Sequence, residues 1–305
     1  MPEPRWLIVV HGGAKTIAPD KEEANRRGCL AAANAGATVL RYGGGAVQAV
    51  EAAIRSLEDD PTFNAGRGST PQASGAVEMD ASIMDGRDLS VGGVAGVRRL
   101  LHPIEGARAV LREPPVLLVA DGAERFAAEH GVALVDPGEL DPAGAPNPER
   151  DTVGAVALDL HGHLAAGTST GGLEGMPDGR VGDTALPGAG LYADDAVGAV
   201  ALSGDGEAIV RVMLASRIVH AMEAGAGPQA AADAKLQQLA RVDGTGEPHE
   251  VSLRGGPEAG AIVLDRQGRI GVAHNSDHFA LGVAGSGVEA RAALGGAELA
   301  DLLDG

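Results

Sequence analysis

The chain is poor in sulfur, in aromatic residues and in positive charge. Cys29 is the one cysteine among 305 residues, which excludes an internal disulfide and a thiolate metal cluster. One Trp, two Tyr and three Phe are too few to stack against the bases of a nucleic acid. Lys and Arg number 24 against 42 Asp and Glu, and the net charge of -18 repels phosphate backbones and anionic membranes. We therefore expect neither a nucleic acid nor a membrane as partner.

Long hydrophobic runs are missing as well. The first apolar run, residues 6–10, is far shorter than the apolar region of a signal peptide, and no run approaches the length of a membrane span. This pattern predicts a cytoplasmic protein. Glycine, by contrast, is abundant, with 47 residues scattered without a Gly-X-Y period, and 44% of the chain is hydrophobic. Such a composition predicts a globular core interrupted by many turns.

The first half of the chain predicts a strand followed by several helices. An apolar strand is expected at residues 6–10, ended by His11-Gly-Gly, and a second strand at 77–84. Apolar residues at helical spacing predict helices at 20–41 with Asp20 as cap, 46–57, 103–112 and 121–131.

A linker and a repeated unit mark the second half. Residues 136–151 carry four prolines and five acidic residues, so we expect them to be exposed. Residues 154–170 align without a gap with 260–276, each an apolar strand, an Asp-x-x-Gly turn and a second strand. A third Gly-Ala-Val-Ala-Leu, at 198–202, precedes a long helix expected from Glu207. Because the strands are too apolar to face water, we expect an α+β fold in which helices flank antiparallel sheets.

Three familiar motifs are incomplete. The segment 11–16 follows a strand but lacks the glycines of a phosphate-binding loop. Residues 167–171 match the Gly-x-Ser-x-Gly elbow of serine esterases, yet no helix can follow directly, so an esterase is a distant alternative. Two clusters that contain histidine are better interpreted as surface polar groups than as a zinc site. They are His161 with His163, and His274 with Asp277 and His278.

Thr152 stands where the acidic linker ends and an apolar strand begins. Cleavage between Asp151 and Thr152 would give Thr152 a free α-amine, whose reference pKa of about 7.7 to 8.0 suits it to take a proton from its own hydroxyl. One residue would then supply both nucleophile and base. The plainer interpretation is a β-branched residue that starts a strand.

Arg180 and Asp183 favour the catalytic interpretation. A guanidinium binds a carboxylate through two N–H donors and a carboxylate accepts from an ammonium, so this pair suits the two charged groups of an amino acid. The segment 168–170 ends the partner strand of Thr152 and adds three hydroxyls nearby.

The order and spacing of six segments resemble the plant-type L-asparaginase and isoaspartyl peptidase family, which are N-terminal nucleophile hydrolases of the threonine type. The resemblance covers nearly the whole chain, and the segments that carry it are 11–14, 57–66, 79–86, 152–156, 168–172 and 179–183. The resemblance implies a four-layer αββα sandwich and self-cleavage between Asp151 and Thr152. Residues 1–151 would form an α subunit and 152–305 a β subunit within one structural domain, and two such pairs a homodimer. No catalytic cofactor is implied.

The resemblance also implies roles for individual residues. Thr152 would be the nucleophile, Thr170 a supporting hydroxyl, and Ser203 with Gly204 the oxyanion hole, where the family commonly has Thr-Gly. Arg180, Asp183 and Asn64 would bind substrate. Backbone carbonyls would hold a structural sodium ion, those of Leu57, Glu58, Asp60, Phe63, Ala65 and Arg67.

The implied reaction is hydrolysis of the side-chain amide of L-asparagine or of isoaspartyl dipeptides, with release of aspartate. Segments 162–170 and 192–195 also resemble glycosylasparaginases, so a glycosylated asparagine is an alternative substrate. An uncleaved, inactive relative that binds amino acids is an alternative of another class.

Overall fold

The structure, a computed structural model, describes residues 5–140, 152–241 and 256–304. Its strands form a large and a small sheet, in which all neighbouring strands are antiparallel except β3 and β4. In spatial order the large sheet contains β12 (Val288–Ala293), β11 (His278–Gly285), β1 (Leu7–Lys15), β5 (Val153–Leu158), β6 (Leu164–Thr170), β2 (Met79–Asp85), β3 (Ser90–Val97) and β4 (Leu117–Val119). The small sheet contains β10 (Ile270–His274), β9 (Ala259–Asp265), β8 (Gly198–Gly204) and β7 (Leu191–Asp194).

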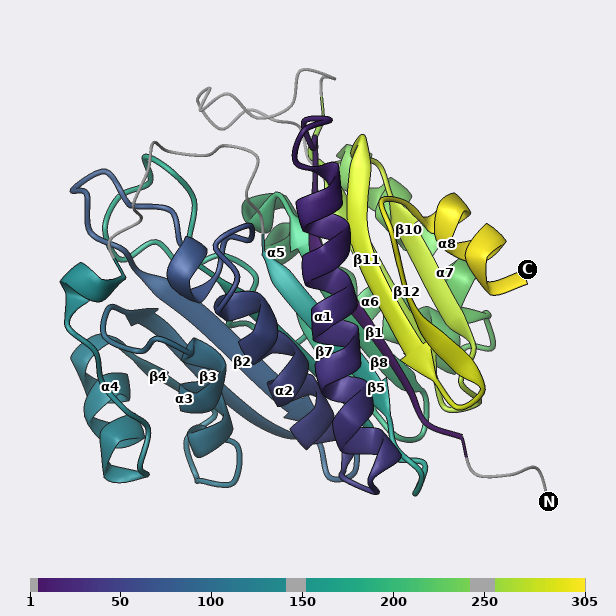
Figure 1. Cartoon of the computed structure of the whole chain (residues 1–305), viewed down its shortest axis with the longest axis horizontal. Coiled ribbons are helices and arrows are strands. Elements are labelled where there is room, and N and C mark those ends of the chain that lie inside the picture. The colour runs from purple at the N-terminus through teal and green to yellow at the C-terminus, as the bar shows by residue number, and fades with distance from the viewer. Residues whose placement is uncertain (1–4, 141–151, 242–255, 305) are drawn as a thin grey trace.

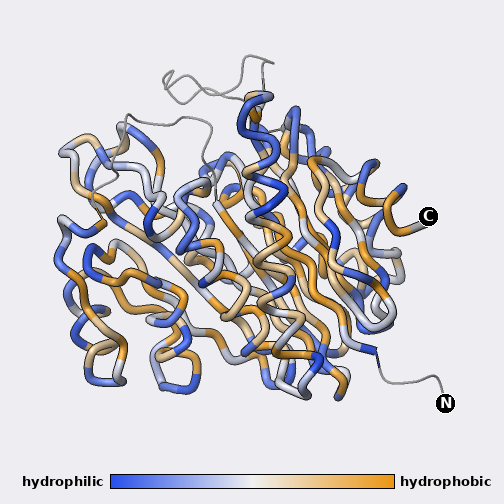
Figure 2. Tube along the Cα trace, in the orientation of Figure 1, coloured by the Kyte–Doolittle hydropathy of each residue, from blue (hydrophilic) through white to orange (hydrophobic). Residues whose placement is uncertain are grey.

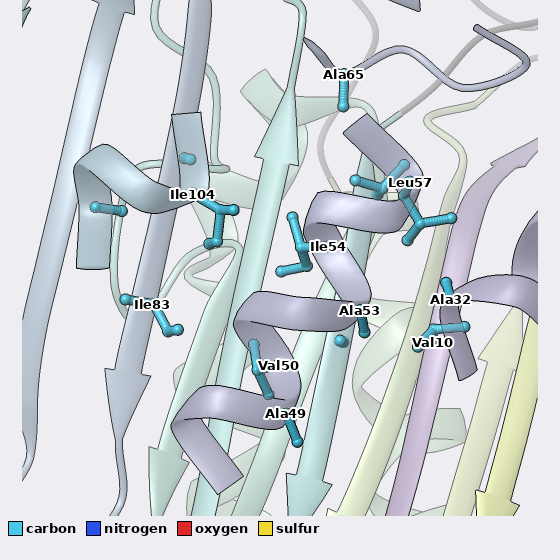
Figure 3. Packing of buried hydrophobic residues seen from close by; sticks show 14 of the residues in the cluster. Val10, Ala32, Ala49, Val50, Ala53, Ile54, Leu57, Ala65, Ile83 and Ile104 are labelled. Atoms are coloured by element: carbon cyan, nitrogen blue, oxygen red, sulfur yellow. The ribbon is translucent and has the colours of Figure 1, made fainter. Parts of the chain in front are cut away.

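Four helices cover one face of the large sheet, and α1 and α2 lie across its strands (Figure 1). They are α1 (Glu22–Arg41), α2 (Ala46–Glu58), α3 (Pro103–Val110) and α4 (Ala120–Glu129). Figure 3 shows how the apolar side chains of α2, among them Val50 and Ile54, pack over the sheet beside Ile83 of β2. We call this buried set the helix-side cluster.

Two further buried clusters lie on either side of the small sheet. The first, which we call the inter-sheet cluster, lies between the facing surfaces of the two sheets. The second, which we call the outer cluster, lies between the small sheet and three helices. Those helices are α5 (Gly206–Val212), α6 (Leu214–Glu223) and α7 (Pro228–Leu236), whereas α8 (Gly296–Asp304) follows β12. The hydropathy colouring shows apolar segments along the strands and polar segments at the turns (Figure 2). The prediction of an α+β fold with helices flanking antiparallel strands is confirmed.

The alternation along β1 explains its apolar sequence. Ile8 and Val10 belong to the helix-side cluster, whereas Val9 belongs to the inter-sheet cluster. Successive side chains of a strand point to opposite faces. Since both faces are buried, every position from Leu7 to Val10 is apolar.

The repeated hairpin is confirmed, with one copy in each sheet. β5 and β6 form the first copy and β9 and β10 the second. Asp159 fixes the first turn by accepting hydrogen bonds from the backbone N–H groups of His161 and His163. Asp265 accepts the equivalent bonds from Gln267 and Arg269.

Several predicted boundaries are wrong for identifiable reasons. β1 continues through His11-Gly-Gly to Lys15, because a bulge between His11 and Ala14 keeps it paired with β11. α1 begins at Glu22 and Lys21, not Asp20, is its N-cap. The long helix expected from Glu207 is two helices, since Met213 adopts a left-handed conformation with φ of +52° between α5 and α6.

The expected linker is exposed only in part. Residues 136–139 are exposed, but Leu140 is buried in the helix-side cluster. Residues 141–151, including Asp151, lie outside the described residues. Among the described helices, none has both the length and the apolar character needed to cross a bilayer.

Candidate active site

Thr152 lies where β5 begins, near the middle of the large sheet. Val153 pairs with Ser169, so Thr152 lies beside the end of β6, whose last residue is Thr170. Val153 belongs to the helix-side cluster, and side chains alternate along a strand, so the Thr152 side chain is directed toward the small sheet. The residue is only 5% exposed.

Ser203 and Gly204 end β8, which packs across β5 and β6. Leu202 belongs to the outer cluster, so the Ser203 side chain is directed toward the large sheet and Thr152's strand. The Ser203 hydroxyl oxygen accepts a hydrogen bond from the Ala14 N–H at 3.2 Å. Gly204 has φ of +137°, and a β-carbon there would lie 2.3 Å from the Glu258 carbonyl oxygen, so only glycine fits.

Thr184 is a hydroxyl neighbour of Thr152 that the sequence analysis missed. The two Oγ1 atoms are 3.5 Å apart. The Thr184 carbonyl accepts hydrogen bonds from Ser82 Oγ at 2.7 Å and from Thr168 Oγ1 at 2.9 Å. Strands β2 and β6 therefore fix the backbone that places this hydroxyl.

Arg180 and Asp183 are brought together as predicted. A β-carbon at Gly206 would lie 3.0 Å from both Arg180 Nη2 and Asp183 Oδ1, so these two atoms are no more than twice that distance apart. The Arg180 guanidinium also binds Glu207, with Nε–Oε1 at 2.9 Å and Nη2–Oε2 at 2.7 Å. Glu207 and the nearby Asp183 raise the pKa of Arg180, against the effect of burial. The guanidinium is therefore charged. It lies next to the carboxylate of Asp183, the residue that precedes Thr184 in the sequence.

Asp80 lies behind this charged pair. It pairs with Thr170 across β2 and β6 and accepts a hydrogen bond from the Gly96 N–H at 2.8 Å. Burial raises the pKa of Asp80 to about 6, although Arg180 and the backbone of Gly182 favour its charged form. Asp80 thus connects strands β2 and β6, where it pairs with Thr170, to the loop that carries Arg180.

Asn64 lies beside the chain that leaves β6. Its Nδ2 donates to the Gly172 carbonyl at 2.6 Å, its Oδ1 accepts from the Thr70 N–H at 3.0 Å, and its own carbonyl accepts from the Gly171 N–H at 2.8 Å. Both polar ends of the amide are therefore engaged with the protein. Asn64 fixes the segment that follows Thr170.

His11 is fully buried, and its ring fills the space left by a glycine in β5, the strand that follows Thr152. A β-carbon at Gly154 would lie 2.3 Å from His11 Nε2. Burial lowers the pKa of His11 to about 3, with the backbone of Thr152 as the main opposing influence. The ring is therefore neutral at physiological pH and packs two residues from Thr152.

This buried histidine predicts a pH-dependent stability. The unfolded chain takes up a proton near pH 6.5 and the folded chain only near pH 3, so stability from this group falls as the pH drops below about 6.5. At pH 5 the loss is about 2 kcal/mol relative to pH 7.5. We expect His11→Gln to lose less stability than the wild type between these pH values, as measured by urea unfolding. Parallel losses in both proteins would contradict this role of His11.

The esterase alternative is wrong. Ser169 lies inside β6, is fully buried and donates a hydrogen bond to Glu58 Oε1 at 2.6 Å. A nucleophile elbow requires an exposed serine on a strand-to-helix turn. Ser169 therefore has a structural role on the helix side of the sheet.

The two histidine clusters have partners within the protein. His163 Nδ1 lies 2.7 Å from Asp195 Oδ2, and His278 Nδ1 accepts from the Ile17 N–H at 3.2 Å. Thr16 donates to Asp277 at 2.9 Å. In the parts of the chain that the structure describes, no group of three or more His, Cys, Asp or Glu residues is arranged to hold a metal ion.

Comparison with known proteins identifies the family of the chain. A family model described as Asparaginase matches residues 4–142 and 140–292. The chain belongs to the asparaginase family. The isoaspartyl peptidase/L-asparaginase of Bos taurus is 44% identical over 260 residues, which cover 79% of this chain and 84% of the relative. Proteins of the same name from Macaca fascicularis and Homo sapiens are 45% and 44% identical over 270 residues, 82% of this chain and 87% of each relative.

Membership of the asparaginase family confirms the resemblance seen in the motifs and makes this chain a hydrolase that acts on amides. The sequence analysis selected Thr152, Arg180 and Asp183 but not Thr184, His11, Asp80 or Glu207. Thr184 carried a signal, because it directly follows Asp183. His11 stands in the opening motif, but nothing in the sequence shows that it packs against Gly154.

In the loop that the asparaginase resemblance links to sodium, two backbone carbonyl groups lie close against glycines of the same loop. A β-carbon at Gly66 would lie 2.4 Å from the Glu58 carbonyl oxygen, and one at Gly68 would lie 1.9 Å from that of Phe63. Such neutral oxygen donors suit a hard cation. The carbonyl groups of Leu57, Asp60 and Ala65 accept backbone hydrogen bonds within the loop, and sodium binding stays a prediction. When bound, the ion would supply positive charge that braces the loop before Asn64 and would take no part in a chemical step.

Proposed function

We propose that this chain cleaves itself between Asp151 and Thr152 and then hydrolyses the side-chain amide of L-asparagine and of β-aspartyl dipeptides, releasing aspartate. The observation that carries the proposal is the position of Thr152, whose hydroxyl lies 3.5 Å from Thr184 Oγ1, one residue from Asp183. This position supports a single site in which Thr152 would be the nucleophile and Asp183, with Arg180, would bind an amino acid. The names of the relatives support this substrate class.

The proposal includes the larger architecture. The helix-side, inter-sheet and outer clusters support a four-layer αββα sandwich of the N-terminal nucleophile type. Residues 1–151 would form the α subunit and residues 152–305 the β subunit of one domain. We propose that two such pairs form the homodimer.

Self-cleavage begins with attack by Thr152 Oγ1 on the carbonyl carbon of residue 151. The C–N bond then breaks, the nitrogen takes a proton, and an ester links residue 151 to the Thr152 oxygen. Water hydrolyses the ester, which leaves a new carboxylate on residue 151 and a free α-amine on Thr152. This amine has a reference pKa of about 7.7 to 8.0, so a substantial fraction is unprotonated at neutral pH.

Amide hydrolysis uses the same hydroxyl. The α-amine accepts the Thr152 hydroxyl proton as the oxygen attacks the side-chain carbonyl of the substrate. The resulting ammonium gives the proton to the leaving nitrogen, so ammonia or an amino acid departs and a β-aspartyl ester remains. Water, deprotonated by the same amine, then releases aspartate and restores Thr152.

Ser203 and Gly204 would stabilise the negative charge that develops on the substrate oxygen. The Ala14 N–H occupies a lone pair of the Ser203 oxygen, and this leaves the hydroxyl proton available for donation. The hydrogen bond from Ala14 thus orients the Ser203 hydroxyl. In a threonine at this position, the β-methyl group would favour the same orientation. The backbone N–H of Gly204 would be the second donor.

The single test of the proposed function is intact mass followed by an activity assay. Purified protein should contain two fragments, residues 1–151 and 152–305, and should release aspartate from L-asparagine and β-aspartyl-leucine. Aspartate release from a protein that remains one chain would contradict the mechanism. A single chain that binds L-aspartate without hydrolysis would support the inactive relative. Preference for glycosylated asparagine would support the glycosylasparaginase alternative.

Gly206→Ala should impair substrate binding. The added methyl would lie 3.0 Å from both Arg180 Nη2 and Asp183 Oδ1, in the space between the two clamp residues. Because alanine favours a helix more than glycine does, α5 itself should not be destabilised. We expect KM to rise at least about tenfold, the equivalent of 1.4 kcal/mol, with complete self-cleavage. An unchanged KM in steady-state assays would place the amino-acid clamp elsewhere.

A further inference from the structure

Glu207 holds one edge of the Arg180 guanidinium. The carboxylate lies in the first turn of α5, and its two oxygens bind Nε and Nη2 at 2.9 and 2.7 Å. The Arg180 side chain is 13% exposed and that of Glu207 is 41% exposed. Such a two-point contact fixes the plane of the guanidinium as well as its position.

The other edge of the guanidinium, formed by Nη1 and Nη2, is bordered by glycines. The β-carbon position of Gly182 lies 2.8 Å from Nη1, and that of Gly206 lies 3.0 Å from Nη2. Neither residue has a side chain that could cover this edge. Because Glu207 binds through Nε and Nη2, the hydrogens of Nη1 and the second hydrogen of Nη2 are directed away from Glu207.

Arg180 is surrounded by several carboxylates that compete for it. Glu207, Asp183 and Asp80 all favour its charged form. A flexible arginine in such a place would divide its time among several orientations, since a guanidinium can pair with any of these groups. The bidentate contact with Glu207 selects one of them.

We propose that Glu207 is a positioning residue that orients Arg180 so that its Nη1–Nη2 edge receives the α-carboxylate of the substrate. This inference rests on the proposed function, because it assumes that the substrate is an aspartyl amide. Glu207 acts through Arg180 and does not touch the reacting atoms. Its effect therefore falls on binding, and the chemical step and self-cleavage depend on other groups.

The chain offers a closely matched control. Glu298 also stands in the first turn of a helix, has a similarly half-exposed side chain and binds an arginine, Arg26. It belongs to α8, which packs against β10, β11 and β12 and not against the strands of the site. Glu298→Ala removes an ion pair with an arginine, together with the hydrogen bond that Glu298 accepts from the Leu294 N–H, and so controls for the loss of a carboxylate in the first turn of a helix.

The experiment compares Glu207→Ala, Glu207→Gln, Arg180→Ala and Glu298→Ala with the wild type. For each protein the readouts are the fraction cleaved by intact mass, kcat and KM for β-aspartyl-leucine, and the Kd for L-aspartate by calorimetry. We expect Glu207→Ala to raise KM and Kd about tenfold, as for the loss of a charge-assisted hydrogen bond. kcat should stay within about twofold of the wild type and cleavage should be complete. Glu207→Gln should lie between, because its amide oxygen still accepts from Arg180.

The outcomes separate this inference from the proposed function. Wild-type values of KM and Kd in both Glu207 variants, while Arg180→Ala loses binding, would overturn the positioning role alone. A fall in kcat at unchanged KM would also overturn it. A wild-type protein that neither hydrolyses β-aspartyl-leucine nor binds L-aspartate would overturn the proposed function and this inference together. A shift in Glu298→Ala equal to that in Glu207→Ala would assign the effect to general loss of a surface charge.

Discussion

We expect Thr152→Ala protein to remain a single chain and to release no aspartate from L-asparagine or β-aspartyl-leucine. Alanine has no hydroxyl to attack the preceding carbonyl, so neither the internal ester nor the free α-amine can form. The substitution removes one oxygen and one methyl carbon from a residue that is 5% exposed, and we expect the fold to persist. Intact mass and an aspartate-release assay on aged samples measure both losses.

Thr152→Ser is the matched control for this loss. Serine keeps the hydroxyl but lacks the methyl group that limits rotation about χ1, so it should still cleave, more slowly than threonine. Recovery of two fragments from Thr152→Ala would assign the cut to a contaminating protease or to another nucleophile. Thr184 would then be the first residue to test, because its hydroxyl is 3.5 Å from that of Thr152.

Ser203→Ala should lower kcat by about 10² to 10³, roughly 3 to 4 kcal/mol, with little change in KM. The charge on the substrate oxygen exists only in the transition state, so its donor contributes to the rate and not to ground-state binding. Self-cleavage is checked first, because the same hydroxyl can assist it. Undiminished kcat in fully cleaved Ser203→Ala protein would move the oxyanion hole onto other donors.

The same substitution should have a second effect. Ser203 Oγ is the acceptor for the buried Ala14 N–H, and alanine would leave this N–H without that partner. An unsatisfied buried donor costs about 1 to 3 kcal/mol, so Tm should fall as well. Ser203→Thr keeps the oxygen and should retain both activity and stability, which separates loss of the hydroxyl from mere disturbance of a fully buried site.

The sequence predicted best those features that depend on neighbouring residues. The two hairpins follow from Asp-x-x-Gly turns whose aspartates bind backbone N–H groups two and four residues later. The helix from Pro103 begins as expected because proline lacks the N–H that the first turn would leave unpaired.

Features set by distant contacts were not predicted. Glu207 meets Arg180 across 27 residues and Thr184 meets Thr152 across 32, and no local pattern encodes either encounter. Met213 breaks a helical pattern with a left-handed backbone that residues other than glycine rarely adopt. Leu140 is buried in the helix-side cluster, although the residues around it in the sequence predict an exposed linker.

The order of strands in the large sheet has a consequence for a chain cut before Thr152. Strands β12 and β11 come from one fragment, β1 from the other, β5 and β6 from the first again, and β2, β3 and β4 from the second. The two polypeptides are therefore interwoven through backbone hydrogen bonds in the large sheet, and neither retains that sheet whole when the other leaves, whereas the small sheet lies entirely within residues 152–305. Unfolding of the cut protein should be dissociation as well, so its recovery should slow on dilution, whereas the uncut chain should refold at a rate independent of concentration.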